Sequence, residues 1–211
     1  MIYLFDFDGT LVDSMPAFAA AITKLFDDHR IPYGPETINA VTPLGLAGLA
    51  RYLRQLGLDT GSEETIASMK KTLLEAYWYH IPAKENVPRV LRALREKGDE
   101  MNILTGSPHM TMDVCLKRLG IFDLFQNIWP CDEFGTTKSD PAVYAMAAEK
   151  LGKPTGEITF LDDNLDAIRT AKAAGMRTIG VYDPTSAPYE KEIRAAADGY
   201  IMNFDELLKF V

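Results

Sequence analysis

From Val87 onward, the sequence alternates between short apolar runs and longer segments whose apolar residues recur at helical spacing. The short runs are typical of buried strands, and glycines end the helical segments between them. Strands that alternate with helices pair in parallel through right-handed crossovers, which predicts a doubly wound, Rossmann-like α/β fold. The predicted strands cover residues 101–104, 128–129, 158–161, 178–181 and, at an edge, 200–201, and a closing helix is predicted at 204–210.

Another apolar run, at residues 2–5, precedes this pattern, and a long helical stretch separates the two. Residues 2–5 are predicted to form the first strand, whereas residues 15–82 carry only helical patterns broken at prolines and glycines. A helical stretch directly after the first strand interrupts the alternation, so we interpret it as an inserted α-helical cap domain. The predicted organisation is a catalytic core of residues 1–14 and 83–211 and a cap domain of residues 15–82.

The composition is that of a globular protein and argues against polyanionic partners. The chain has 211 residues, of which 47% are hydrophobic and 25% charged, and its net charge is −8. An acidic chain repels nucleic-acid backbones and anionic membrane surfaces, so we expect neither of them as a partner. A small phosphorylated molecule needs only a local positive pocket and stays compatible with this charge.

The cysteines and the apolar segments bear on the compartment. The two cysteines, Cys115 and Cys131, suggest neither a disulfide framework nor a metal site. No apolar run approaches the roughly 20 residues that span a bilayer. The first predicted strand begins too early for a signal peptide to precede it. We therefore expect a cytoplasmic protein, and we expect it to be a monomer or a homodimer.

Two aspartates directly follow the first predicted strand. Asp6 and Asp8 are two residues apart, the spacing that puts strand side chains on the same side, and Gly9 permits a turn after them. Carboxylates this close repel each other and need a cation, a shared proton or hydrogen-bond donors. Because open α/β sheets bind ligands at the carboxyl ends of their strands, this pair predicts a functional site. Taken alone, the pair is equally typical of turn and helix-capping residues.

Polar side chains also follow the later predicted strands. Parallel strands bring their carboxyl ends to one edge of the sheet, so these side chains are expected to lie near Asp6 and Asp8. Asn164, next to them, fits the N-cap of a helix better than a catalytic role. The side chains at this edge are Thr105 and Ser107, Lys138, and Asp162 and Asp163.

In their order and spacing, these residues resemble the four motifs of the haloacid dehalogenase-like hydrolase superfamily. The similarity is to the phosphoglycolate phosphatase-like branch, which has a helical cap inserted after the first strand, and it covers the whole chain. It implies a Mg²⁺-dependent phosphatase that hydrolyses a small phosphate monoester. The matching segments are residues 6–10 (Asp-Phe-Asp-Gly-Thr), residues 104–107 (Leu-Thr-Gly-Ser), Lys138 with Asp140, Pro141 and Tyr144, and residues 160–163 (Phe-Leu-Asp-Asp).

The resemblance implies catalytic roles for three side chains. Asp6 would be the nucleophile that forms an aspartyl phosphate, and Asp8 would be the general acid and then the general base. An aspartate at position 8 favours phosphoryl transfer, because the family's dehalogenases typically carry tyrosine there. Lys138 would neutralise both the Asp6 carboxylate and the phosphate, a role that suits a flexible ammonium.

The resemblance also implies a phosphate site and a metal site. Thr105 and the backbone N–H groups of Gly106 and Ser107 would hold the phosphoryl oxygens. Mg²⁺ prefers oxygen ligands and binds through a few carboxylates together with the substrate phosphate. Its ligands would be Asp6, the backbone carbonyl of Asp8 and Asp163, with Asp162 binding directly or through water.

Substrate specificity would come from the cap domain, which closes over the substrate and excludes bulk water. Arg51 could meet a second anionic group, although an exposed helix residue is the simpler interpretation. A closed site suits a phosphoglycolate-like acid, a sugar phosphate or a nucleotide. The candidate contacts are Thr42, Leu44, Gly45 and Arg51, near the break between the cap helices, and Lys84 in the segment that returns to the core.

Several alternatives use a similar set of residues. A phosphomutase of the same superfamily protects its aspartyl phosphate from water, and product analysis separates it from a phosphatase. A dehalogenase and a non-catalytic phosphate-binding protein are further alternatives. A signalling receiver domain places its acidic pair after the first strand and its acceptor aspartate in mid-chain, which is the reverse of the order found here.

Overall fold

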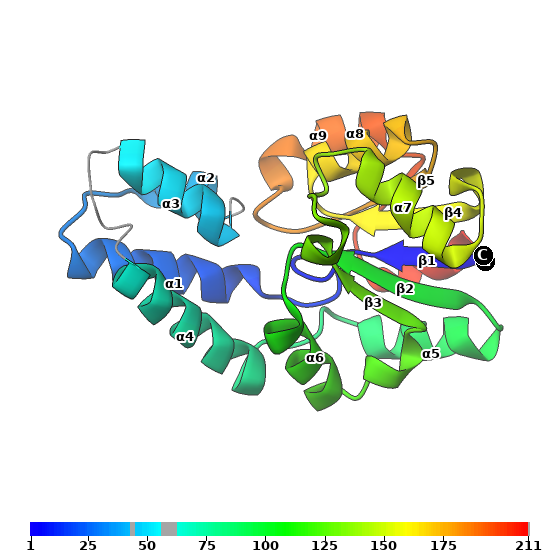
Figure 1. Ribbon diagram of the computed structural model, residues 1–211, viewed down its shortest axis with the longest axis horizontal. Helices are drawn as coiled ribbons and strands as arrows, with labels where there is room; N and C mark the ends of the chain where they lie inside the picture. The colour runs from blue at the N-terminus through cyan, green and yellow to red at the C-terminus, as the bar shows by residue number, and fades with distance from the viewer. Residues whose placement is uncertain (43–44, 56–62, 211) are drawn as a thin grey trace. The chain divides into compact units, whose positions relative to one another are not determined.

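The computed structural model describes residues 1–42, 45–55 and 63–210. The chain divides into two compact units, which we call the sheet unit (Met1–Asp13 with Pro82–Val211) and the helical unit (Ser14–Ile81). Figure 1 shows the elements of both. Among the described residues, no helix combines the length and the apolar character that a membrane crossing requires.

The sheet unit is built on a six-stranded sheet in the order β3-β2-β1-β4-β5-β6, in which every pair is parallel. This arrangement confirms the predicted doubly wound α/β fold. The chain runs from β1 outward to β3 and then returns to the other side of β1, so the strand order reverses between β1 and β4. The strands are β1 (Ile2–Phe5), β2 (Glu100–Thr105), β3 (Asn127–Pro130), β4 (Ile158–Asp162), β5 (Arg177–Val181) and β6 (Gly199–Ile201).

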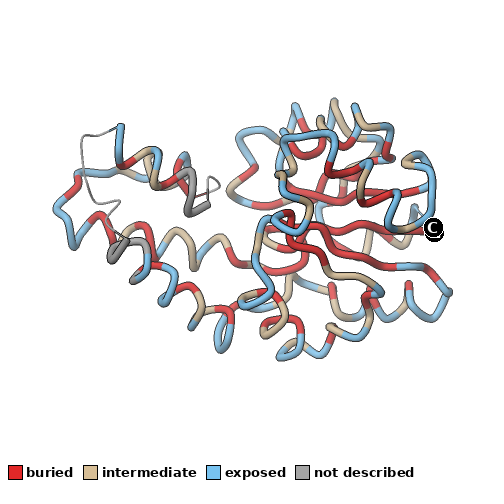
Figure 2. Tube along the Cα trace, in the orientation of Figure 1, coloured by how far each residue is buried: buried red, intermediate tan, exposed pale blue. Residues whose placement is uncertain are grey.

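Helices cover both faces of this sheet (Figure 1). On one face, α7 (Ala142–Leu151) and α8 (Leu165–Ala173) pack on Ile2 and Leu4 of β1. On the other face lie α5 (Val87–Glu96) and α6 (His109–Arg118), and the ring of Phe5 stacks there on Phe204 at 6.2 Å. Adjacent residues of β1 therefore serve opposite cores, and Figure 2 shows the strand buried throughout.

Two elements near the carboxyl terminus differ from the sequence-based expectation. The helix α9 (Glu190–Ala196) was not predicted, because Ile193 is the one residue it buries and no apolar stripe marks it. The predicted closing helix is a 3₁₀ helix at Phe204–Lys209. Both are short elements whose packing, rather than their sequence pattern, decides the backbone conformation.

The helical unit contains α1 (Met15–Asp28), α2 (Pro35–Val41), α3 (Gly45–Gln55) and α4 (Glu63–Tyr79). It has a hydrophobic core of its own, separate from the two cores of the sheet unit. The buried members of that core are Ala21, Ile22, Leu25, Phe26, Ile31, Val41, Leu49, Leu53, Met69 and Leu73.

Candidate active site

The neighbouring strands β1 and β4 bring two acidic segments together at the point where the strand order reverses. Phe5 pairs with Leu161, and the backbone N–H of Asp6 continues the ladder by donating to the carbonyl of Leu161 at 2.8 Å. Asp6 and Asp162 consequently lie side by side at the carboxyl ends of adjacent strands. A crevice at this position is where doubly wound sheets bind their ligands.

Three carboxylates gather at this point. One oxygen from each of Asp6, Asp162 and Asp163 lies within 4.8 Å of the others, and all three residues are buried. Burial of three like charges is costly unless a cation or protons compensate them. The arrangement therefore fits a divalent cation that takes oxygen ligands, such as Mg²⁺.

Lys138 provides the positive charge that the protein itself contributes. Its Nζ lies 2.7 Å from Oδ1 of Asp6 and 2.7 Å from Oδ2 of Asp162, so one ammonium joins the ends of β1 and β4. Burial disfavours the charged form, but the carboxylates of Asp162 and Asp6 outweigh it and hold the pKa of Lys138 well above its ordinary value. The lysine is therefore cationic throughout the physiological range.

Tyr144 fixes the segment that carries Lys138. Its hydroxyl is within donor distance of two carbonyls, those of Lys138 at 3.0 Å and Ala167 at 3.2 Å, and its buried ring packs on Phe160 of β4. Burial, followed by the charge of Asp162, raises the pKa of Tyr144 and keeps the hydroxyl protonated as a donor. The tyrosine of the third motif thus acts on the lysine through the backbone.

The pKa values of Asp162 and Asp163 reflect their burial and the nearby negative charges. Burial raises the pKa of Asp162 to about 6, against the opposing effect of the Lys138 ammonium. Burial and then the charges of Asp162 and Asp6 raise the pKa of Asp163 well above its ordinary value. Without a metal ion, Asp162 and Asp163 therefore keep their protons to a higher pH than ordinary aspartates do.

Gly9 and Thr10 line the acidic cluster, a contribution that the strand-end analysis did not include. Gly9 has a φ of +77°, and a Cβ there would meet the carboxylate of Asp163 at 2.7 Å, so only glycine fits. Thr10 is buried and donates its hydroxyl to Oδ1 of Asp163 at 3.1 Å. The turn after β1 therefore forms one wall of the cluster and orients one of its carboxylates.

The end of β2 contributes the groups expected to hold phosphate. The hydroxyl of Ser107 donates to the carboxylate of Asp8, which links the loop after β2 to the loop after β1. The backbone N–H of Ser107 donates to Oγ1 of buried Thr105 at 3.2 Å, so this N–H already has a partner. At Gly106 a Cβ would meet nothing within 4 Å, which leaves the backbone there open to approach.

Asn164 has the capping role that the sequence favours. Its side chain accepts hydrogen bonds from the backbone N–H groups of Asp166 at 2.9 Å and Ala167 at 3.2 Å at the start of α8. Its own backbone N–H donates to Oδ1 of Asp162 at 2.7 Å. The cap thus orients Asp162 while it starts the helix.

The cap candidates lie in the helical unit, and the structure describes each by its local surroundings. Thr42 is buried and donates its hydroxyl to the carbonyl of Ile38 at 2.7 Å. Gly45 begins α3, and Arg51 is an exposed residue on the same helix. Leu44 lies outside the described residues.

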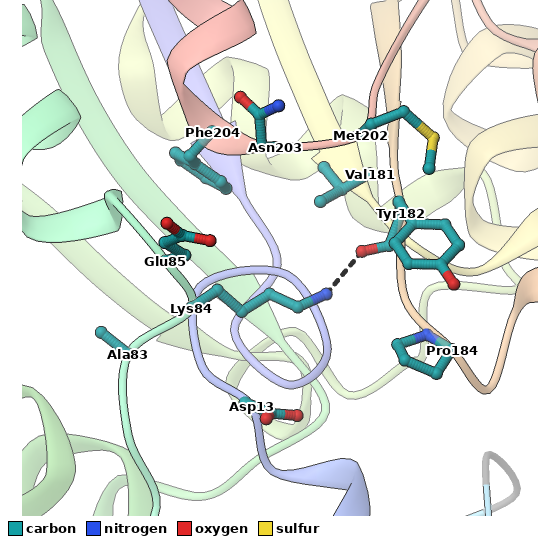
Figure 3. A pocket seen from close by; sticks show the side chains of 10 residues that line it. All are labelled: Asp13, Ala83, Lys84, Glu85, Val181, Tyr182, Pro184, Met202, Asn203 and Phe204. Atoms are coloured by element: carbon teal, nitrogen blue, oxygen red, sulfur yellow. Dashed lines mark hydrogen bonds between the residues drawn. The ribbon is translucent and has the colours of Figure 1, made fainter.

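Lys84, a further specificity candidate, has its ammonium occupied within the sheet unit. It donates to the carbonyls of Gly9 and, at 2.6 Å, of Tyr182, and it pairs with Asp183 at 3.0 Å. Figure 3 shows the Tyr182 contact beside a pocket of about 240 Å³. Lys84 is therefore bound to the protein's own groups, and Asp183 is a partner that the sequence analysis did not single out.

Comparison with known proteins gives a family for this fold and site. The model of haloacid dehalogenase-like hydrolases matches residues 1–175. A phosphoglycolate phosphatase from Pectobacterium atrosepticum is 30% identical over 187 residues, which cover 84% of this chain and 78% of that protein.

Two solved structures share the fold. A predicted phosphoglycolate phosphatase from Haemophilus somnus superposes with a TM-score of 0.80 at 23% identity, covering 99% of this chain and 96% of that one. A β-phosphoglucomutase from Clostridium difficile superposes with a TM-score of 0.77 at 20% identity, covering 98% and 93%. At these identities the structures establish the fold alone. With the family model matching most of its length, the chain belongs to the haloacid dehalogenase-like hydrolase family.

Proposed function

We propose that this hydrolase is a Mg²⁺-dependent phosphatase that acts on a small phosphate monoester through an aspartyl phosphate. The observation that carries the proposal is the cluster of Asp6, Asp162 and Asp163, in which the Lys138 ammonium binds two of the three carboxylates, those of Asp6 and Asp162. Three buried acids at the carboxyl ends of two adjacent strands, with one lysine bound to two of them, fit a site for a metal ion and a phosphate. The phosphoglycolate phosphatase among the relatives supports the same reaction class.

In the first step, a carboxylate oxygen of Asp6 bonds to phosphorus while the bond from phosphorus to the substrate's alcohol oxygen breaks. Asp8 gives its proton to that departing oxygen. In the second step, Asp8 takes a proton from water, whose oxygen bonds to phosphorus as the Asp6–phosphorus bond breaks. The products are the alcohol and inorganic phosphate, and both aspartates return to their starting states.

The remaining residues position the phosphoryl group. Lys138 is bound to Asp6 and would place its charge beside the phosphoryl oxygens. Thr105, the open backbone at Gly106 and the loop that ends in Ser107 would hold the other side. Ser107 also holds the carboxylate of Asp8, which keeps the proposed acid near the leaving oxygen.

The acidic cluster fits the proposed metal ion. Asp6 and Asp163 would be ligands, together with the backbone carbonyl of Asp8, and Asp162 would bind directly or through water. Bound Mg²⁺ would draw the phosphate toward Asp6 and offset the negative charge that develops there. The close approach of Gly9 and the hydroxyl of Thr10 keep the Asp163 carboxylate in place for that role.

For the substrate, we propose a small phosphorylated acid of the phosphoglycolate type, with sugar phosphates and nucleotides as the next classes to test. The helical unit would act as the cap, and Thr42, Gly45 and Arg51 stay the candidate contacts. Of these, Arg51 carries the charge that a substrate carboxylate needs, and it is exposed. Support for the phosphoglycolate class comes from the relative named above.

The direct test measures phosphate release from a panel of phosphate esters with Mg²⁺, with a chelator, and with Asp6→Asn. Release that needs both Mg²⁺ and Asp6 is the expected result. Conversion of one phosphate ester into another without free phosphate would instead identify a phosphomutase. Phosphate binding without turnover of any ester, by a folded protein, would identify a non-catalytic binding protein.

A further inference from the structure

Lys84 reaches from the segment that returns from the helical unit to the turn that follows β1. Its ammonium donates to the carbonyl of Gly9 and to that of Tyr182 at 2.6 Å, and it lies 3.0 Å from Oδ2 of Asp183. The side chain of Lys84 is 16% exposed and that of Asp183 is fully buried. One ammonium thus connects the turn after β1, the end of β5 and the segment that returns from the helical unit. Figure 3 shows the side chain of Lys84 extending to Tyr182.

Asp183 is a fixed counter-ion for this lysine. Its Oδ1 accepts hydrogen bonds from the backbone N–H of Thr185 at 2.9 Å and from the Thr185 hydroxyl at 2.6 Å. The turn is closed by the N–H of Ser186, which donates to the carbonyl of Asp183 at 3.1 Å. The turn after β5 therefore holds the carboxylate in one orientation and leaves Oδ2 directed at Lys84.

The backbone of Lys84 is fixed as well. Its N–H donates to the carbonyl of Leu11 at 3.0 Å, and the N–H of Asp13 donates to the carbonyl of Pro82 at 3.0 Å. Val12 and Ala83 form an antiparallel bridge between these two bonds. The lysine side chain consequently starts from a defined position next to the chain that leaves β1.

One of the two carbonyls that Lys84 binds is that of Gly9, which packs closely on the acidic cluster. A Cβ on Gly9 would lie 2.7 Å from both carboxylate oxygens of Asp163, so a small shift of this residue changes the space available to that carboxylate. Thr10, the next residue, donates to the same carboxylate. Asp8, which precedes Gly9, accepts a hydrogen bond from the hydroxyl of Ser107.

We infer that Lys84 is a positioning residue, whose ammonium, balanced by Asp183, fixes the Gly9 carbonyl and with it the loop that presents Asp8 and orients Asp163. The inference rests on the proposed function, because the geometry being held is that of the metal and phosphoryl site. A neutral side chain at position 84 would release the Gly9 carbonyl and leave the Asp183 charge buried without a counter-ion. The double variant Lys84→Met/Asp183→Asn separates these two effects, since it removes the stranded charge but not the loss at Gly9.

The test compares Lys84→Met, Asp183→Asn and the double variant with wild type and with Lys153→Met, which removes an exposed lysine of the same unit. For each protein, calorimetry gives the Kd for Mg²⁺, steady-state kinetics give kcat and KM, and a thermal melt gives Tm. We expect Lys84→Met to weaken Mg²⁺ binding and to lower kcat, each by about 10–100-fold, which is the usual effect of removing a group that orients metal ligands. The KM should change little. Asp183→Asn keeps the carbonyl contacts of Lys84 and should stay closer to wild type.

The double variant decides between positioning and charge balance. We expect it to regain much of the Tm lost in Lys84→Met while Mg²⁺ affinity and kcat stay low. Recovery of all three quantities, or wild-type Mg²⁺ affinity and kcat in Lys84→Met, would overturn the inference. A wild-type protein that binds Mg²⁺ but releases no phosphate would overturn the proposed function alone, and one that binds no Mg²⁺ would overturn both.

Discussion

Oγ1 of Thr10 lies 3.1 Å from Oδ1 of Asp163 and donates a hydrogen bond to it, although 153 residues separate the two in the sequence. The threonine of the first motif thus orients a carboxylate of the fourth. Both residues are buried, so solvent cannot replace this donor. The pair connects the turn after β1 to the acidic segment after β4, which is the connection that a metal site spanning both strands requires.

Replacement of Thr10 by valine keeps the shape of the side chain and removes this donor. We expect Thr10→Val to weaken Mg²⁺ binding about tenfold, since groups that orient metal ligands contribute about 10–100-fold to affinity. Calorimetric titration with Mg²⁺ measures the change. Thr10→Ser, which keeps the hydroxyl, is the matched control and should bind nearly as well as wild type. Equal affinities for valine, serine and threonine would show that the hydrogen bond has no part in the metal site.

Asp163→Asn should make the metal-free protein more stable while it removes the stabilisation by Mg²⁺. The folded-state pKa of Asp163 is raised, so its contribution to stability is complete below the unfolded-state pKa and is lost as pH rises through the folded value. Asparagine does not titrate, so the variant keeps its stability as the pH rises. At a pH above that pKa, we expect the metal-free variant to melt a few degrees above the metal-free wild type.

Thermal melts with chelator and with Mg²⁺, at several pH values, test this expectation. The advantage of Asp163→Asn over wild type in chelator should grow with pH, and Mg²⁺ should raise the Tm of wild type alone. Asp123→Asn, at an exposed position, is the control for loss of one charge. A metal-free Asp163→Asn protein that melts below wild type at every pH would contradict the crowding of charges described here.

Binding of Mg²⁺ should release protons and should weaken as the pH is lowered. Burial raises the pKa of Asp162 to about 6, and the pKa of Asp163 is raised as well. At lower pH, protons therefore bind to the carboxylate oxygens that would coordinate the ion. Calorimetry in two buffers of different ionisation enthalpy, at pH 6 and at pH 8, gives the number of protons released. We expect more protons released at pH 6 than at pH 8. Heats that do not depend on the buffer at either pH would refute the linkage.

The residues that sequence reasoning brought to one edge of the sheet share a simple signal, a polar group just after an apolar run. Asp6 and Asp162 lie beside each other because β1 and β4 pair in parallel, and the alternation of strands with helices predicts such pairing. Lys138 does not follow a strand directly; it was placed at this edge because its segment leads into a later helix, and its role was implied by the resemblance. Spacing alone does not reveal its contacts with both aspartates or the hydrogen bond that its carbonyl accepts from the hydroxyl of Tyr144.

The contacts of Lys84 show where such reasoning ends. Gly9 is 75 residues away from Lys84 in the sequence and Tyr182 is 98, and nothing in the local pattern of either segment indicates a meeting. A lysine next to a proline-containing segment is typical of an exposed linker residue. Only the register of the return segment against Leu11 and the end of β5 turns its side chain inward. Asp183 does follow a strand, so the strand-end signal was present there but was not used.

Tyr144→Phe should separate the placement of Lys138 from the binding of the metal ion. The change deprives the carbonyls of Lys138 and Ala167 of a buried donor, and an unmade buried hydrogen bond costs about 1–3 kcal/mol. We expect Tm to fall and kcat to drop, because the ammonium beside Asp6 loses its support, while the Kd for Mg²⁺ stays close to wild type. Tyr189→Phe, at an exposed tyrosine of the same unit, should leave all three quantities unchanged. A loss of Mg²⁺ affinity as large as the loss of kcat would mean that Tyr144 supports the whole acidic cluster rather than the lysine.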